Sequence, residues 1–198
     1  MKIFLFTLLT LITVNSFAQI KRVKFIDATF ENGMLYPIAQ ISGSDDIASK
    51  MNADILINIQ DLKDADFCIG QYGFVQKGSH IQIHLFCNCI DFKESQNRYF
   101  LYNIESGENV KNSDILAPNK KKAASKYLKE MTDNHIKSNN LSIDPAALKL
   151  IVSDNIDAFK VTFKRDGMDM WLLNDKWGDK PMSITWGAMR SFMKYSFL

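Results

Sequence analysis

The run from residue 80 to residue 89 constrains the fold more than any other part of the sequence. Its odd-numbered positions are apolar (Ile81, Ile83, Leu85, Cys87, Cys89), and its even-numbered positions are mostly polar (His80, Gln82, His84, Phe86, Asn88). Strict alternation predicts a half-buried strand of an antiparallel sheet. Residues 98–104 alternate in the same way, and the polar stretch 91–97 between the two runs predicts a hairpin.

Helical patterns occur on both sides of this hairpin. Ile47, Met51, Ile55 and Ile59 recur every four residues and predict an amphipathic helix over 45–60, which Ser44 or Asp45 can cap. Further helices are predicted over 120–139, from about 142 and over 186–195, and further strands over 21–29, 159–163, 168–173 and 181–185. The sequence therefore predicts an α+β fold, with an antiparallel sheet packed against a few helices in a single domain.

The first residues have the pattern of an export signal. Lys2 is followed by an apolar run over 3–14 and then by the small residues Ser16 and Ala18. This order is typical of a signal peptide, and a run of about 12 residues falls short of the roughly 20 needed to span a bilayer. We expect a signal peptide over 1–18, cleavage after Ala18, and one domain over 19–198 that is periplasmic or secreted. No later segment is apolar enough to predict a membrane span.

The charge balance limits the class of partner. The chain has 24 Lys and Arg against 22 Asp and Glu, a net charge of +2. Nucleic acid is not an expected partner, because phosphate binding needs a concentrated positive field. We interpret the short cationic run Lys120-Lys121-Lys122 as the solvated start of a helix.

The sequence predicts neither a cofactor nor a metal. Gly-x-Ser-x-Gly, Gly-x-Gly-x-x-Gly, P-loop and His-Glu-x-x-His motifs are all missing from it. On one regular strand His80 and His84 would lie about 13 Å apart, too far to share an ion. Catalytic residues are therefore not assigned, and a non-enzymatic role is favoured.

Three cysteines leave two interpretations. Cys87 and Cys89 lie two apart on one strand, at about 6.5–7 Å, which is at the edge of disulfide geometry. Cys68 could bond to one of them and leave one thiol free. We favour three buried reduced thiols, since free cysteine behaves as a small apolar residue.

Two segments are candidates for a binding surface. Residues 171–186 hold three tryptophans interspersed with charged residues, a combination typical of interfaces with proteins or sugars. From this segment we assign Trp171, Asp175 and Trp177 to binding, although tryptophan is also commonly part of a core. Tyr72 and Phe74, beside Gly70 and Gly73, form a second candidate patch.

Three stretches resemble one family of bacterial extracytoplasmic domains. The first contains Tyr36-Pro37-Ile38, a turn at Ile41-Ser42-Gly43 and a helix carrying Met51-Asn52. The second runs over 99–108 into Ser113-Asp114-Ile115-Leu116, and the third includes the strand 159–163, Gly167 and Ile184-Thr185-Trp186. These features resemble the DUF3298/DUF4163-like family, which includes the outer part of a lysozyme-sensing anti-sigma factor and the accessory region of some peptidoglycan deacetylases. Where that family often has a Gly- and His-containing run, this chain has residues 85–89.

The resemblance implies an α+β fold and a binding role. We expect a non-catalytic domain that recognises a protein or a cell-wall ligand such as a glycan. One alternative is an immunity or inhibitor protein directed against a secreted enzyme. Another is an envelope hydrolase with an unrecognised carboxylate pair, about 5–10 Å apart in one cleft.

Overall fold

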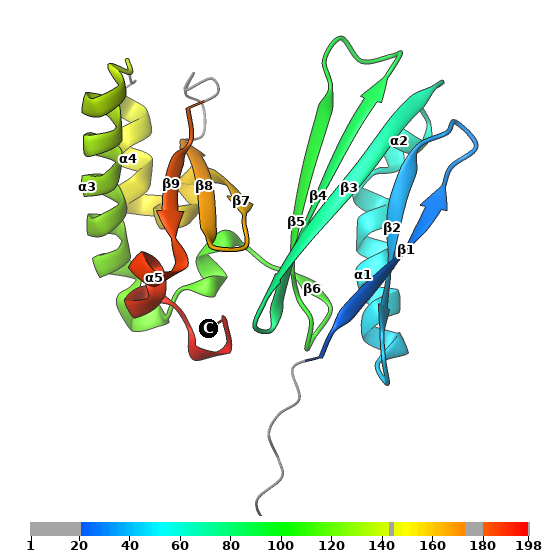
Figure 1. The fold of residues 1–198 in the computed structure, drawn as a ribbon, viewed down its shortest axis with the longest axis horizontal. Helices are drawn as coiled ribbons and strands as arrows, with labels where there is room; N and C mark the ends of the chain where they lie inside the picture. The colour runs from blue at the N-terminus through cyan, green and yellow to red at the C-terminus, as the bar shows by residue number, and fades with distance from the viewer. Residues whose placement is uncertain (1–20, 143–144, 173–179, 198) are drawn as a thin grey trace, which may run out of the picture.

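The computed structural model describes residues 21–142, 145–172 and 180–197. Its elements form an N-terminal layer, a central sheet and a C-terminal layer (Figure 1). The predicted α+β fold is confirmed, with three antiparallel sheets in place of one. Within the described residues, no helix combines the length and the apolar character that crossing a bilayer requires.

The N-terminal layer is a hairpin covered by a helix. Strands β1 (Val23–Thr29) and β2 (Leu35–Ile41) pair antiparallel, and α1 (Asp45–Asn58) and the short α2 (Gln60–Lys63) follow. The four-residue spacing predicted for α1 is confirmed, because Met51, Ile55 and Ile59 are fully buried. Ser44 is the N-cap residue but makes no side-chain capping bond, so the capping bond expected there is wrong; its hydroxyl accepts Lys21 Nζ at 2.7 Å instead.

The central sheet has the strand order β3-β4-β5-β6. Its bounds are β3 (Cys68–Lys77), β4 (His80–Cys89), β5 (Gln96–Asn103) and β6 (Glu108–Asn109). Odd-numbered residues of β4 and even-numbered residues of β5 face α1 and form one core with it. The predicted β4–β5 hairpin is therefore confirmed.

The C-terminal layer covers part of the opposite face of this sheet (Figure 1). Its helices are η1 (Asn112–Ile115), η2 (Pro118–Lys120), α3 (Lys121–Asn139), α4 (Pro145–Asp154), η3 (Asn155–Ala158), α5 (Trp186–Met189), η4 (Arg190–Phe192) and η5 (Tyr195–Phe197). Its strands are β7 (Phe159–Phe163), β8 (Gly167–Leu172) and β9 (Met182–Thr185), in that order. The single closing helix predicted over 186–195 is wrong: α5 gives way to η4 after one turn.

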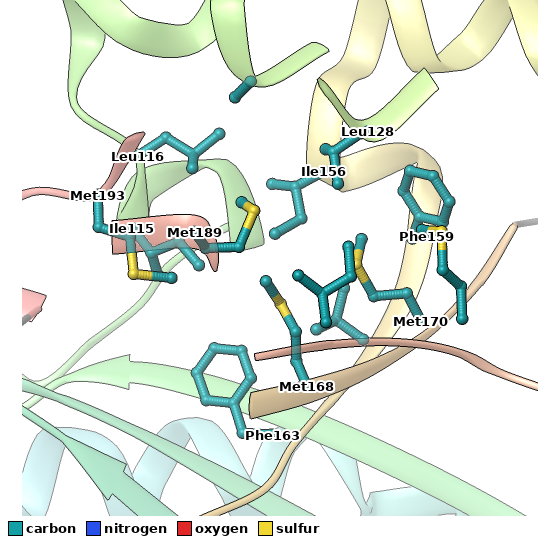
Figure 2. Close-up of a cluster of buried hydrophobic side chains, with 14 of the residues drawn as sticks. Ile115, Leu116, Leu128, Ile156, Phe159, Phe163, Met168, Met170, Met189 and Met193 are labelled. Atoms are coloured by element: carbon teal, nitrogen blue, oxygen red, sulfur yellow. The ribbon is translucent and has the colours of Figure 1, made fainter. Parts of the chain in front are cut away.

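A second core lies inside the C-terminal layer. Figure 2 shows Met168, Met170, Met189 and Met193 meeting aliphatic side chains such as Ile156. Methionine is flexible enough to fill the irregular space between a short sheet and several short helices. Trp186 belongs to the same core, and its indole N–H donates to the Lys164 carbonyl at 3.0 Å.

One buried amide joins the central sheet to the C-terminal layer. Gln82 Nε2 donates to the Val161 carbonyl at 3.0 Å, and its Oε1 accepts the Phe163 N–H at 2.6 Å. The side chain thus pairs with β7 as a neighbouring strand would. His80 and Gln82 are only 3% and 4% exposed. The face of β4 that looked polar in the sequence is therefore buried at this end of the strand.

Replacing Gln82 by Met keeps the side chain's size but removes both hydrogen bonds. The Val161 carbonyl and Phe163 N–H would then be buried without a partner, at about 1–3 kcal/mol for each group. We expect Gln82→Met to lower the free energy of unfolding by about 2–4 kcal/mol in urea titrations. Gln40→Met on the exposed part of β2 is the matched control, and an equal effect of the two substitutions would contradict this role.

His80 makes stability depend on pH. Burial lowers its pKa below 6.5, the nearby charge of Lys194 lowers it further, and Asp114 acts in the opposite direction. As the pH falls through about 6.5, the unfolded chain binds a proton that the folded protein resists, so stability decreases. We expect the free energy of unfolding to fall between pH 8 and pH 5, and less steeply in His80→Gln. Identical slopes for the two proteins would show that His80 plays no part.

Candidate functional site

A cleft of about 1560 Å³ opens between the central sheet and the C-terminal layer. One wall holds Gln82 of β4 and Tyr99 and Leu101 of β5, and the other holds the first half of α3 together with β7. Ligand pockets for small molecules are usually about 300–1,000 Å³. The cleft is large enough for a segment of a polymer.

Lysine is the dominant residue type in the cleft. Six line it, all exposed: Lys111, Lys121, Lys122, Lys126, Lys129 and Lys160. Only two aspartates, Asp114 and Asp157, accompany them, so the lining has a net charge of +4. Since the whole chain has +2, the remainder of the chain has −2. The cleft therefore concentrates positive charge that the overall balance hides.

Within the part of the chain that the structure describes, the cleft lysines form no ion pairs. The ion pairs among the described residues involve Lys50, Arg98 and Lys164, and none of the six cleft lysines. On α3, Lys122, Lys126 and Lys129 follow the i, i+4, i+7 spacing of one helix face, while Ala124 and Leu128 are buried on another. Like charges at this spacing each cost a few tenths of a kcal/mol. The arrangement costs stability locally, as functional sites commonly do.

Hydrogen bonds to the main chain hold the floor of the cleft in place. Asp114 accepts the Lys111 N–H at 3.0 Å, and Asp157 accepts the Ser113 N–H at 2.8 Å. Both carboxylates therefore fix η1. One carboxylate oxygen of each aspartate thus already accepts a backbone hydrogen bond.

Asn155 fixes the start of α3 against η3. Its backbone is left-handed, with φ of 58°, a conformation that asparagine tolerates better than most residues. Its side-chain N–H groups donate to the Lys121 carbonyl and, at 2.8 Å, to Ser125 Oγ. The lysine-bearing first turns of α3 are therefore anchored rather than frayed.

Three aromatic side chains and one lysine, which we call the aromatic ladder, border the cleft: His84, Tyr99, Lys160 and Trp171. Lys160 Nζ lies 4.9 Å from the Tyr99 ring centroid and 5.5 Å from that of Trp171, and His84 stacks on Tyr99 at 4.4 Å. Trp171, a predicted binding residue, is half-buried and lies in this ladder. The structure therefore places one predicted residue beside the cleft.

The other predicted patch lies elsewhere. Tyr72 and Phe74 both contact Phe25 on the α1 side of the sheet; Tyr72 packs against the core there, whereas Phe74 is 48% exposed. The Tyr72 hydroxyl donates to Asp27 Oδ1 at 2.6 Å, and burial together with this bond raises its pKa to about 12. Tyr72 and Phe74 are thus not brought together with Trp171. Asp175 and Trp177 lie outside the described residues, so their role stays a prediction.

The cysteines form a buried cluster. Cys68, Cys87 and Cys89 place their sulfurs within 4.8 Å of one another, the only grouping of three or more potential metal ligands among the described residues. Cys68 and Cys89 face each other across β3 and β4 and are joined by a disulfide, which leaves Cys87 Sγ at 2.9 Å from Cys89 Sγ. The favoured interpretation of three reduced thiols is therefore wrong. Burial raises the pKa of the free Cys87 thiol.

Little in the sequence predicts the cleft. Its lysines come from the segment after β6, from α3 and from β7, up to 49 positions apart between Lys111 and Lys160. The even overall charge does not predict the concentrated positive charge of this surface. The one local signal was the spacing of lysines along α3, opposite to its apolar stripe.

Comparisons with known proteins identify similar folds. No family model and no curated protein matches the sequence. A DUF3298 family protein from Pseudomonas aeruginosa PAO1 is similar in structure, with a TM-score of 0.48 and 11% identity over 90% of this chain and 94% of that one. A DUF3298 family member from Bacteroides fragilis NCTC 9343 has a TM-score of 0.42 and 8% identity over 89% and 93%.

Thiol titration distinguishes the two cysteine interpretations. With Cys68 and Cys89 bonded and Cys87 buried, we expect no rapid reaction of the folded protein with a thiol reagent. We expect one reactive thiol after denaturation without reductant, and three after denaturation with reductant. Three thiols without reductant would overturn the disulfide.

Proposed function

We propose that this chain is a non-catalytic binding domain that acts outside the cytoplasm, and that its lysine-lined cleft binds a negatively charged protein or cell-wall ligand. The observation that carries the proposal is the net charge of +4 on one concave surface. A cleft focuses the field of its charges, which raises the local concentration of an oppositely charged ligand and its rate of association.

The residues between the lysines suit the same ligand class. Asn109, Asn112, Asn119 and Ser125 line the cleft and offer side-chain N–H and O–H donors. Carboxylate, phosphate and sulfate groups accept such bonds, and the bonds are stronger when the acceptor is charged. Tyr99 and Trp171 hold the Lys160 ammonium group beside these donors by cation–π contacts.

We favour a binding role over hydrolysis because both cleft carboxylates accept backbone hydrogen bonds. Asp114 and Asp157 accept main-chain N–H groups of the segment that forms the floor. Each is a structural part of the wall, surrounded by cations. The proposal therefore assigns recognition to the lysines and no chemical step to the aspartates.

Charge reversal in the cleft tests this proposal. We expect the chain from Gln19 onwards to bind fluorescein-labelled poly-L-glutamate and polygalacturonate in anisotropy titrations, more weakly as NaCl rises from about 50 to 300 mM. The triple variant Lys122→Glu, Lys126→Glu, Lys129→Glu should bind at least about tenfold more weakly, a loss of about 1.4 kcal/mol. All three positions are exposed, and an acidic residue at position 122 in the first turn of α3 also suits the helix dipole, so the variant is expected to fold.

The matched control reverses three exposed lysines away from the cleft: Lys24, Lys93 and Lys137. It has the same net charge as the cleft variant, so it separates the local field from the overall charge. We expect binding within about threefold of the unaltered protein. Equal losses in the two variants would contradict a specific cleft, and so would stronger binding of an oligonucleotide than of either polyanion.

A further inference from the structure

The outer edge of β5 is open beside the cleft. Strand β6 pairs with β5 only at Tyr102 and Asn103. The Ile104 N–H donates to the carbonyl of Ser79, just before β4, whereas the Leu101 carbonyl accepts the Val110 N–H on the opposite side. Backbone groups alternate sides along a strand, so the N–H and C=O groups of Asn97 and Tyr99 point away from β4. No strand among the described residues pairs with them.

Such an edge is usually protected. Natural sheets blunt their edges with charged side chains, prolines, bulges or a covering segment. The described part of β5 contains no proline, and its one cation, Arg98, is turned toward Asp61 of α2 at 2.7 Å. The edge at Asn97 and Tyr99 can therefore still accept a partner strand.

The open edge and the lysines belong to one surface. Tyr99 and Leu101 line the cleft, and Val110 and Lys111 lie where β6 leaves the edge. Lys160 approaches from the other wall to 4.9 Å from the Tyr99 ring. A chain paired with Asn97 and Tyr99 would thus run into the cleft with cations on both sides of it.

We propose that the ligand is an extended acidic polypeptide segment that adds to the sheet as a strand along β5, with its carboxylates among the cleft lysines. The main-chain bonds give affinity and the lysines select acidic side chains, as in other cases of strand addition. A polypeptide is favoured over a glycan because it presents N–H and C=O groups at the strand repeat of about 6.8 Å that Asn97 and Tyr99 offer. This inference rests on the proposed function of the cleft.

A proline at position 97 tests the edge on the protein side. The Asn97 N–H points away from β4, so Asn97→Pro removes no bond within the sheet and blocks the donor that the added strand needs. Asn97→Ala is the matched control, because both substitutions remove the side-chain contact with His84 Nε2 at 2.9 Å. With a labelled twelve-residue peptide of alternating Glu and Thr, we expect about tenfold weaker binding for Asn97→Pro and less than about twofold for Asn97→Ala.

The same peptide with N-methylated central amides tests the pairing on the ligand side. Its charge is unchanged, but it cannot donate along the edge. We expect at least about tenfold weaker binding than the unmodified peptide, together with slowed hydrogen exchange at the Tyr99 amide when the unmodified peptide is bound. Thermal unfolding of each protein variant checks that the sheet is intact.

The outcomes separate this inference from the proposed function. Equal binding of both peptides, lost on cleft charge reversal, would overturn strand addition and leave an anion-binding cleft. Binding of polygalacturonate but of neither peptide would also overturn it, because the ligand would then be a glycan. Binding of no polyanion at all would overturn both proposals.

Discussion

The buried amide of Gln82 sets how the two halves of this protein meet. A side-chain amide in a core is costly unless all of its polar atoms are paired. Here the amide is paired with Val161 and Phe163, and it can make both hydrogen bonds only when β7 lies at one particular position along β4. That position places the sheet face with Tyr99 opposite the start of α3, and so creates the two walls of the cleft.

Residues 194–196 also hold the central sheet and the C-terminal layer together. Ser79, in the turn between β3 and β4, donates its N–H to the Ser196 carbonyl, and Gly78 lies so close to this carbonyl that a side chain would collide with it. The backbone N–H of Lys194 donates to the carbonyl of Ile115 at the end of η1, beside the cleft floor. Contacts between segments more than 75 positions apart thus position the residues around Lys111. The site is a product of the assembled layers and of no single motif.

This explains which features could be predicted from the sequence. The α1 helix and the β4–β5 hairpin follow from periodicity, because their apolar faces are local patterns that one core buries. The buried His80 and Gln82 could not be predicted, since their cover comes from β7 and the C-terminal tail. The disulfide depends on the register that places Cys68 opposite Cys89, which spacing within β4 alone does not contain. The cleft was missed for the same reason, because net charge averages over surfaces that folding separates.

The balance of rigid and mobile parts determines what kind of binding the cleft supports. Its backbone is fixed by Asp114, Asp157 and Asn155, so little ordering of the main chain opposes association. The lysine side chains are exposed and lose rotamer freedom of up to about 2 kcal/mol each when they are held. In the proposed binding role, many weak, screened contacts would give fast association but modest affinity and little discrimination among polyanions. Selectivity would then have to come from directional groups nearby, such as the open backbone of β5 at Asn97 and Tyr99.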